Sequence, residues 1–411
     1  MKLDYRHTRA ACYLGYVIQA IVNLFPPLLF VRFREEFGVS LAQLTLVVMV
    51  NFSTQITTDL VATPFILRYG YRVSMVAAQG CAAFGLLGLA LLPDLLPNPY
   101  LGILIPMAVS AIGGGLMEVL VSPVVQSLPS KNKVAEMNFL HSAYCWGAMF
   151  IILASTALFA TVGISHWRAI SASWAIVPVL NALLLLRVPI ATPEDDGAKG
   201  LGLAGLLRSG VFWLLVLLMV CSGASELAMS QWASLFAEKG LLVNKTMGDL
   251  LGPCAFAFLM ATARLWYGFK SERLDLRRSL VATSVLCIAS YVLAVFSPHP
   301  VLSLVGCGLC GLSVGFMWPG TFSLATQALP RGGTLMFALL AFAGDIGCAV
   351  GPGTVGLVSN HLKTLGRGFF AFFGSDPEIA ALKSGMLCAA VFPLLLAMFA
   401  RAVRKSQEEN A

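Results

Sequence analysis

The sequence predicts an all-α integral membrane protein, with twelve transmembrane helices arranged as two pseudo-symmetric six-helix bundles. Of its 411 residues, 58% are hydrophobic and only 11% are charged, whereas soluble domains carry roughly a quarter charged residues. Apolar runs of about 20 residues, the length that crosses a hydrocarbon core of ~30 Å, recur along nearly the whole chain. A charged stretch at residues 193–200 separates six of these runs from the other six.

The predicted spans are set by the apolar runs and by the short polar connections between them. Within the longer spans, Pro26-Pro27, Pro64, Pro253 and Pro319 predict bends or breaks, because proline cannot donate a helical hydrogen bond. In chain order the spans are residues 10–33, 41–67, 71–92, 99–125, 134–160, 168–190, 209–238, 246–270, 277–297, 300–328, 332–361 and 375–401.

The basic residues predict the orientation of the chain in the membrane. Most of the 27 Lys and Arg residues fall in alternate connections and at the two ends. The positive-inside rule therefore places both termini in the cytoplasm of a multi-pass protein of the cytoplasmic membrane. Lys2, Asp4, Arg6 and Arg9 lead straight into a full span, so we expect no cleaved signal peptide. Topology also accounts for the net charge of +7, and we expect the lipid bilayer, not nucleic acid, as a partner.

The two halves resemble each other in sequence. Gln126 ends the fourth span and Gln327 ends the tenth, and at the same offset Gly114 corresponds to Gly315 and Tyr144 to Asp345. Parallel six-helix repeats are a common transporter design. We expect an N-terminal half at residues 1–190, a mobile cytoplasmic linker at 191–208 and a C-terminal half at 209–411 with a short cytoplasmic tail.

Polar side chains line one face of several spans at helical spacing. Such stripes either bind one another or line a common cavity, while a lone Ser or Asn can simply bond its own helix. Four stripes together favour a cavity. They are Tyr16, Gln19, Asn23 and Pro27; Asn51, Gln55 and Asp59; Ser222, Glu226, Ser230 and Ser234; and Asn138, His141 and Cys145, with Tyr144 beside them.

Ionisable residues inside spans are expensive and are functional leads by default. Glu118, Glu226 and Asp345 lie well inside their spans, where a carboxyl can exchange a proton when the cavity changes sides. With His141, they are the candidates for proton coupling. The alternative is a structural pair, for instance Asp345 with His141 or Arg264. Asp59 lies nearer the cytoplasmic end, where we expect it to lock helices together.

Candidate substrate contacts are polar or aromatic residues at a similar depth. Tryptophan can stack on the apolar face of a sugar ring or another planar ligand, although core packing is the alternative for each one. The candidates are Asn23, Asn138, His141, Tyr144, Gln231, Trp232 and Trp318. Ten cysteines fall almost entirely within spans, and we expect neither a disulfide nor a metal site.

Four segments resemble the major facilitator superfamily, and within it the L-fucose/proton symporter branch. They are residues 114–123, 138–148, 226–232 and 315–322. The resemblance implies the fold of that superfamily and a proton-coupling role for Glu118. It also departs from the branch: the first-helix Asp lines up with Pro27, and sugar-contacting amides become His141 and Tyr144. The resemblance therefore does not extend to fucose itself.

The loop after the second span resembles the conformational lock of the superfamily. It keeps the Arg-x-Gly-x-Arg pattern as Arg68, Gly70 and Arg72, with Leu67 at the usual Asp position. Arg264 and residues 270–273 partly repeat this pattern after the eighth span. We expect Asp59, Arg68, Gly70, Arg72 and Arg264 to act in gating.

These features predict a carrier and not an enzyme, with no cofactor. The sequence contains no Gly-x-x-x-x-Gly-Lys-[Ser/Thr] nucleotide loop, which argues against transport driven by ATP hydrolysis. We expect a monomeric secondary transporter that moves a small polar solute, sugar or glycoside-like, by alternating access, coupled to protons or another ion. The alternatives are an efflux antiporter for drugs or amphiphiles and a carrier-like receptor without transport.

Overall fold

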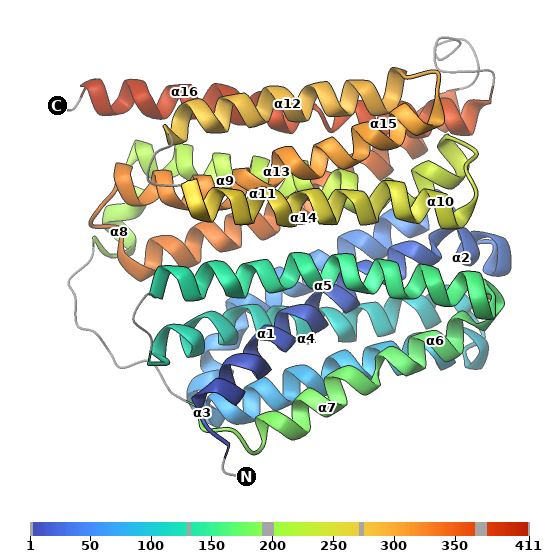
Figure 1. The fold of residues 1–411 in the computed structure, drawn as a ribbon, viewed down its shortest axis with the longest axis horizontal. Helices are drawn as coiled ribbons and strands as arrows, with labels where there is room; N and C mark the ends of the chain where they lie inside the picture. Colours follow the sequence, from blue (N-terminus) through green and yellow to red (C-terminus); the bar gives the residue numbers. More distant parts are fainter. Residues whose placement is uncertain (1–2, 130–132, 191–200, 271–274, 366–375, 410–411) are drawn as a thin grey trace. The chain divides into compact units, whose positions relative to one another are not determined.

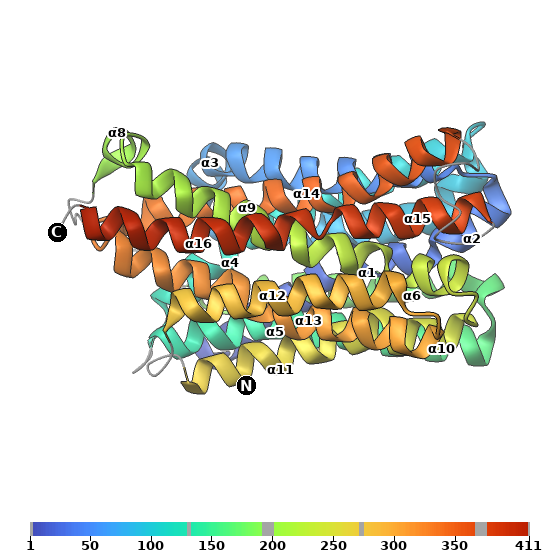
Figure 2. The same cartoon turned by 90° about the horizontal axis from the view of Figure 1, so that it is seen from above.

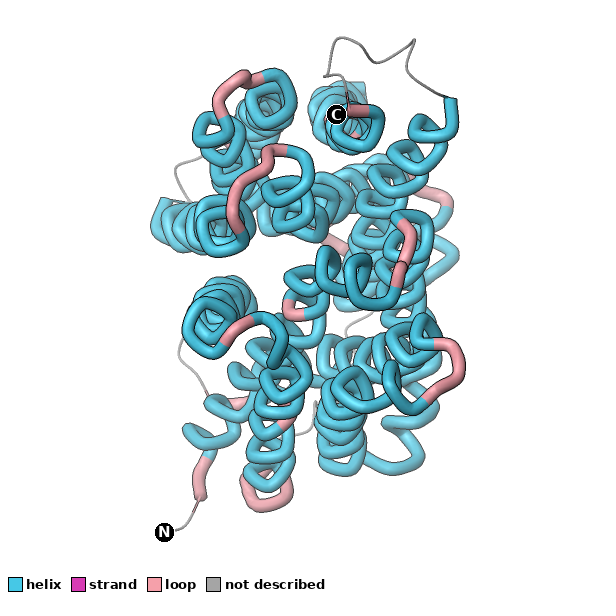
Figure 3. The backbone as a smooth tube through the Cα atoms, turned by 90° about the vertical axis from the view of Figure 1, so that its right-hand side faces the viewer, coloured by secondary structure: helices cyan, strands magenta, loops and turns pink. Residues whose placement is uncertain are grey.

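The computed structural model describes residues 3–129, 133–190, 201–270, 275–365 and 376–409. Within these ranges the chain forms helices and loops, without a strand (Figure 3). Twelve helical segments of this described part are long and apolar enough to cross a membrane. The predicted all-α, twelve-helix membrane fold is confirmed. The chain forms two compact units, Met1–Asp195 and Asp196–Ala411, each with six of the spans.

The N-terminal unit begins with a span that is bent, as its prolines predict. Pro26 and Pro27 open a 3₁₀ turn between two α-helices of this span. The third helix contains two spans that part at Gly70, whose φ of +79° is a conformation that glycine adopts readily. The elements are α1 Tyr5–Leu24, η1 Pro26–Leu29, α2 Phe30–Phe37, α3 Leu41–Leu95, α4 Pro99–Ser127, α5 Lys133–Val162, η2 Ile164–His166, α6 Trp167–Trp174 and α7 Ile176–Leu185.

The C-terminal unit contains two short π-helical turns, which widen the helix and occur most often at functional sites. One of them includes Pro253, where the sequence predicts a break, whereas Pro319 lies within a continuous helix. The elements are α8 Gly202–Leu207, α9 Gly210–Leu235, η3 Phe236–Gly240, α10 Lys245–Asp249, η4 Leu250–Cys254, α11 Ala255–Lys270, α12 Leu276–Phe296, α13 Pro300–Ala328, α14 Gly333–Leu365, α15 Pro377–Cys388 and α16 Val391–Glu409.

The last span of each unit is broken near its middle, which the sequence prediction did not anticipate. In the N-terminal unit the break lies between Trp174 and Ile176, and in the C-terminal unit it lies between Cys388 and Val391. Pro178 and Pro393 follow these breaks. Proline lacks the N–H that would bond the carbonyl four residues earlier, so the helix is interrupted one turn before it. The same device in both units agrees with an internal repeat.

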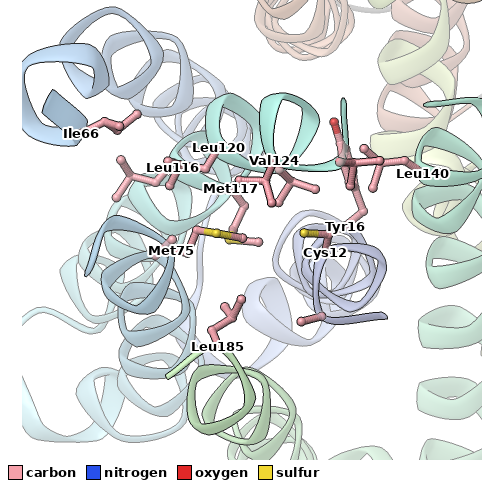
Figure 4. Close-up of a cluster of buried hydrophobic side chains, with 14 of the residues drawn as sticks. Cys12, Tyr16, Ile66, Met75, Leu116, Met117, Leu120, Val124, Leu140 and Leu185 are labelled. Atoms are coloured by element: carbon pink, nitrogen blue, oxygen red, sulfur yellow. The ribbon is translucent and has the colours of Figure 1, made fainter. Parts of the chain in front are cut away.

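Helix packing in the N-terminal unit centres on α4. α1 lies against α4 and α5 (Figure 1). An apolar cluster joins α1, α3, α4 and α7, with Cys12, Met75, Met117 and Leu185 among its members (Figure 4). The tyrosine of this cluster, Tyr16, extends its hydroxyl to Ser122 on α4. Apolar packing and polar contacts therefore share the α1–α4 interface.

Glycines bring helices together in the C-terminal unit, as their spacing predicts. Gly347 and Gly351 of α14 lie against the backbone of α9, which packs against both α14 and α16 (Figure 2). Gly311 and Gly315 of α13 lie against α11 in the same way. Gly315 thus contacts the eighth span. Gly114, its counterpart in the repeat, contacts the second span in the same way.

The predicted linker is partly helical. Within residues 191–208, α8 spans Gly202–Leu207 and packs against α9 and α14, and the Leu201 N–H donates to the Arg331 carbonyl at 3.0 Å. Residues 191–200 lie outside the described part of the chain.

The close approach of α3 and α4 gives the first testable prediction. A Cβ on Gly115 would lie 2.9 Å from both the Gln55 carbonyl oxygen and the Asp59 Oδ1. Gly115→Ala must therefore push the helices apart, and we expect it to lower the free energy of unfolding by about 1–3 kcal/mol. Thermal unfolding of the purified protein in detergent measures the change.

Gly80→Ala in the neighbouring helix α3 is the control, because nothing lies within 4 Å of a Cβ at Gly80. We expect this variant to keep or slightly raise the melting temperature, since Ala favours the helix. Equal melting temperatures for the two variants would contradict the packing described for α3 and α4.

Candidate functional site

Glu118 is the half-buried acid of α4, and its only hydrogen bond within the described residues comes from a neutral amide. The Gln19 Nε2 of α1 donates to the Glu118 Oε2 at 2.6 Å. The salt bridges of the described chain do not include Glu118. Its side chain keeps partial exposure, whereas Gln19 is only 5% exposed. An acid held this way has no nearby positive charge to offset the cost of its ionisation.

A second polar contact lies one helical turn along α1. The Asn23 Oδ1 accepts from the Asn51 Nδ2 at 3.2 Å and from the Gln55 Nε2 at 3.0 Å. All three amides are buried, and the two donors belong to the first span of α3. One carbonyl oxygen thus joins α1 to two successive turns of α3.

The two groups of contacts lie next to each other, and we call four of their residues the polar ring: Gln19, Asn23, Gln55 and Glu118. Gln19 and Asn23 are four residues apart on α1, so they lie on one face. Gln55 lies beside Gly114, since a Cβ there would be 3.3 Å from the Gln55 Oε1. Gly114 in turn precedes Glu118 by one turn of α4. Three helices therefore present contiguous polar groups within an apolar unit.

His141 reaches the same region through an aromatic contact. The Tyr16 and His141 rings meet edge to face with centroids 5.5 Å apart, and the Tyr16 hydroxyl lies 3.3 Å from the Ser122 Oγ. Tyr16 thus joins α5 to α4, one turn from Gln19. Tyr144 is half-buried on α5, and the side chain of Asn138 lies outside the described part.

The acid of the C-terminal unit has a different partner. The Arg264 Nη2 of α11 lies 3.0 Å from the Glu226 Oε2 of α9, with side chains 13% and 8% exposed. From the sequence, Arg264 is a gating residue and a possible structural partner of Asp345. In the structure, Arg264 contacts the Glu226 carboxylate, and both charges of this pair lie within spans.

The remaining C-terminal candidates are spread over three helices. Trp232 is fully buried, and its Nε1 donates to the Pro352 carbonyl of α14 at 3.0 Å, so it joins two helices. Gln231 and Asp345 are buried on α9 and α14. Trp318 of α13 is half-buried and lies against Gly344, next to Asp345.

The lock residues of the N-terminal unit lie at the end of its helices that carries the N-terminus. The Arg72 Nη1 donates to the carbonyls of Leu185 and Leu186 at 2.8 Å each, which caps the end of α7. The Arg68 guanidinium lies 5.4 Å from the Tyr69 ring centroid. Asp59 lies at Gly115, on the α3–α4 interface.

A charged cluster that the sequence did not predict lies at the two π-helical turns. The Lys245 Nζ lies 2.9 Å from both the Glu238 Oε1 and the Asp249 Oδ2, and 2.8 Å from the Ser234 Oγ. The Asp249 side chain is fully buried. The signal available in the sequence was the spacing of Lys245 and Asp249 by one helical turn.

Metal binding has no support in the described ranges, where groups of three or more His, Cys, Asp or Glu side chains that could hold an ion are absent.

Comparisons with known proteins place this geometry in a wider context. The family model described as Major Facilitator Superfamily matches residues 12–352. No curated protein sequence matches the chain.

Solved structures resemble the chain along nearly its whole length. A bacterial homolog of the human lysosomal transporter Spinster, inward-facing and occupied, has a TM-score of 0.76 at 16% identity, over 98% of this chain and 97% of that chain. A D-xylose–proton symporter has 0.77 at 14%, over 95% and 97%. The E. coli fucose:proton symporter has 0.65 at 15%, over 96% and 98%. At such identities these likenesses establish the fold alone.

The Glu226–Arg264 pair gives the second prediction. Glu226→Gln removes the carboxylate that Arg264 contacts, and we expect it to destabilise the protein by about 3–5 kcal/mol, because a buried charge loses its partner. The double variant Glu226→Gln/Arg264→Gln removes both charges and should recover much of that loss. Thermal unfolding of the four proteins in one detergent measures the coupling.

The control is Lys363→Gln, which breaks an ion pair with Glu378 whose side chains are 43% and 32% exposed. An exposed pair contributes at most ~1 kcal/mol. A Glu226→Gln variant no less stable than this control would show that the buried pair does not hold α9 and α11 together.

Proposed function

Because the chain belongs to the major facilitator superfamily, we propose that it is a proton-coupled secondary transporter that moves a small polar solute by alternating access. We propose the cytoplasmic membrane as its location, with both termini in the cytoplasm, and a monomer as the working unit. The transporter fold and the basic residues of the connections support these assignments.

The observation that carries the proton coupling is the partner of Glu118. Glu226, the buried acid of α9, has Arg264 beside it, whereas Glu118 has the Gln19 amide. An ionised carboxylate without a cation is costly in a medium of low dielectric constant, and protonation removes that cost. Glu118 is therefore the acid whose protonation state responds most to access from water.

Gln19 can serve both protonation states of Glu118. Its Nε2 donates to the carboxylate at 2.6 Å, and its Oε1 has no donor within the described residues. A protonated carboxyl gains an O–H, which an amide oxygen accepts after the amide rotates. The pair thus stays hydrogen-bonded in both protonation states of Glu118 through a local rotation of the amide.

Glu226, by contrast, remains ionised against Arg264 in this proposal and anchors α9 to α11. Asp345 and His141 remain further candidates for coupling. His141 is linked to the surroundings of Glu118, because Tyr16 contacts both the His141 ring and Ser122, one turn from Glu118.

We place the solute at the polar side chains of the N-terminal unit. Asn23 belongs to the polar ring, and His141 and Tyr144 lie on α5, which contacts α1 and α4. The helices α1, α3 and α4 supply amides and a carboxylate together. A polyhydroxylated solute such as a sugar fits groups of this kind. The sugar–proton symporters with the same fold support this choice as an analogy.

The proposed coupling predicts the behaviour of Glu118→Gln. This variant keeps the side-chain size but cannot ionise, so we expect it to lose accumulation driven by a pH gradient while it still exchanges solute across the membrane at equal concentrations. Proteoliposomes that contain the purified protein, screened first for a transported solute by counterflow, give both readouts and the direction of transport.

Glu378→Gln is the matched control, since it neutralises a partly exposed acid outside the polar ring. It should accumulate solute as the original protein does. Undiminished gradient-driven accumulation by Glu118→Gln would remove Glu118 from the coupling mechanism, and the absence of counterflow by the original protein for every solute would favour a receptor.

A further inference from the structure

The polar ring and its neighbour Asn51 contain two buried amide oxygens that lack a hydrogen-bond donor. These are the Gln19 Oε1 and the Asn51 Oδ1, in side chains that are 5% and 2% exposed. Buried polar groups in proteins are nearly always paired, and each one that is not calls for an explanation. The residues of these two oxygens are neighbours, because Asn51 donates to Asn23, which lies one turn from Gln19 on α1.

Rotation of the amides does not remove this deficit. While Glu118 is ionised, the Gln19 Nε2 donates to its Oε2, and a rotated amide would turn its oxygen toward a carboxylate. The Asn51 Nδ2 donates to the Asn23 Oδ1, and rotation there would place two oxygens together. The orientation of both amides is therefore set by their donors, and their oxygens remain as acceptors.

The charge around these acceptors has one sign. Glu118 adds a carboxylate, and the stretches of α1, α3 and α4 that hold the network contain no Lys or Arg between Arg9 and Arg32, from residue 41 to 67, or from 99 to 127. An anionic group would meet repulsion from Glu118 and find no cation in these segments. A group that donates hydrogen bonds would find a carboxylate and two amide oxygens.

We propose that the Gln19 Oε1 and the Asn51 Oδ1 accept hydrogen bonds from hydroxyl or ammonium groups of the transported solute, which makes the solute a neutral polyol or an amine and not an organic anion. This inference rests on the proposed transport function. It names two residues that determine specificity and assigns the solute to the class of hydrogen-bond donors.

A single buried amide oxygen without a donor is not enough to indicate a solute contact, as two other amides show. Gln79 and Asn181 each also have an oxygen without a donor. Gln79 donates to the Met117 Sδ, and Asn181 donates to the Ala11 carbonyl, both at the apolar cluster. Neither joins an ionisable side chain or a second such oxygen, so both serve as controls.

The test uses solutes matched in size and different in charge. Sets of glucose, glucosamine and glucuronate, of other neutral polyols, and of amines and carboxylates of similar size are added to the purified full chain, and the melting temperature is measured. We expect stabilisation by members of the neutral or amine classes and none by carboxylates. Stabilisation by a carboxylate, or by no neutral or amine member, would overturn the assignment.

Variants then test the residues themselves. For a solute that stabilises the protein, Asn51→Leu should weaken binding about tenfold, the effect of one lost hydrogen bond, while Asn181→Leu should leave the dissociation constant unchanged. Equal binding by these two variants would show that the Asn51 oxygen faces an ordered water only, and would overturn its role.

The proton-coupling proposal can fail separately. Binding of neutral or amine solutes that is not linked to protons would contradict the coupling by Glu118 and leave the solute class standing. Proton-coupled transport of a carboxylate would contradict the solute class and leave the proton coupling standing. The relative response of glucose and glucosamine distinguishes a hydroxyl donor from an ammonium donor.

Discussion

The hydrogen bond from Gln19 to Glu118 is the interaction on which this account depends. Lipid offers no water to a buried polar group, so each one must find its partner inside the protein. Glu118 finds a neutral amide at 2.6 Å instead of a cation. The Glu118 carboxylate therefore has no positive charge to offset its own, and the bond joins α1 to α4. The bond also turns the Gln19 Oε1 away from the carboxylate. Proton exchange and solute recognition then become two uses of one network.

The two units treat their buried acids differently although their helices follow one plan. Glycines of the fourth and tenth spans pack on the second and eighth, and a proline breaks the last span of each unit. Within this shared frame, Glu226 meets Arg264, while Glu118 meets an amide. The ion pair of Glu226 and Arg264 is suited to holding helices together. Glu118, which has an amide and no cation beside it, is suited to changing its charge. The asymmetry thus divides structural and coupling roles between the units.

The sequence was sufficient for the spans, because long apolar runs report membrane crossing directly. It also identified the stripe that holds Gln19 and Asn23. The sequence did not decide which acid Arg264 contacts, and only the structure places Glu226 3.0 Å from its guanidinium. Trp232 matched an aromatic substrate contact by depth, yet it lies fully buried against Pro352. The roles of the predicted site residues in transport stay predictions, since helix rotation decides what each side chain faces.

The most direct test of the central claim is infrared difference spectroscopy of the protein in lipid, recorded between low and high pH. Our account predicts a protonated-carboxyl band that appears at low pH, disappears in Glu118→Gln and persists in Glu226→Gln. A band that persists in Glu118→Gln and disappears in Glu226→Gln would contradict it, because the acid that changes charge would then be the one beside Arg264.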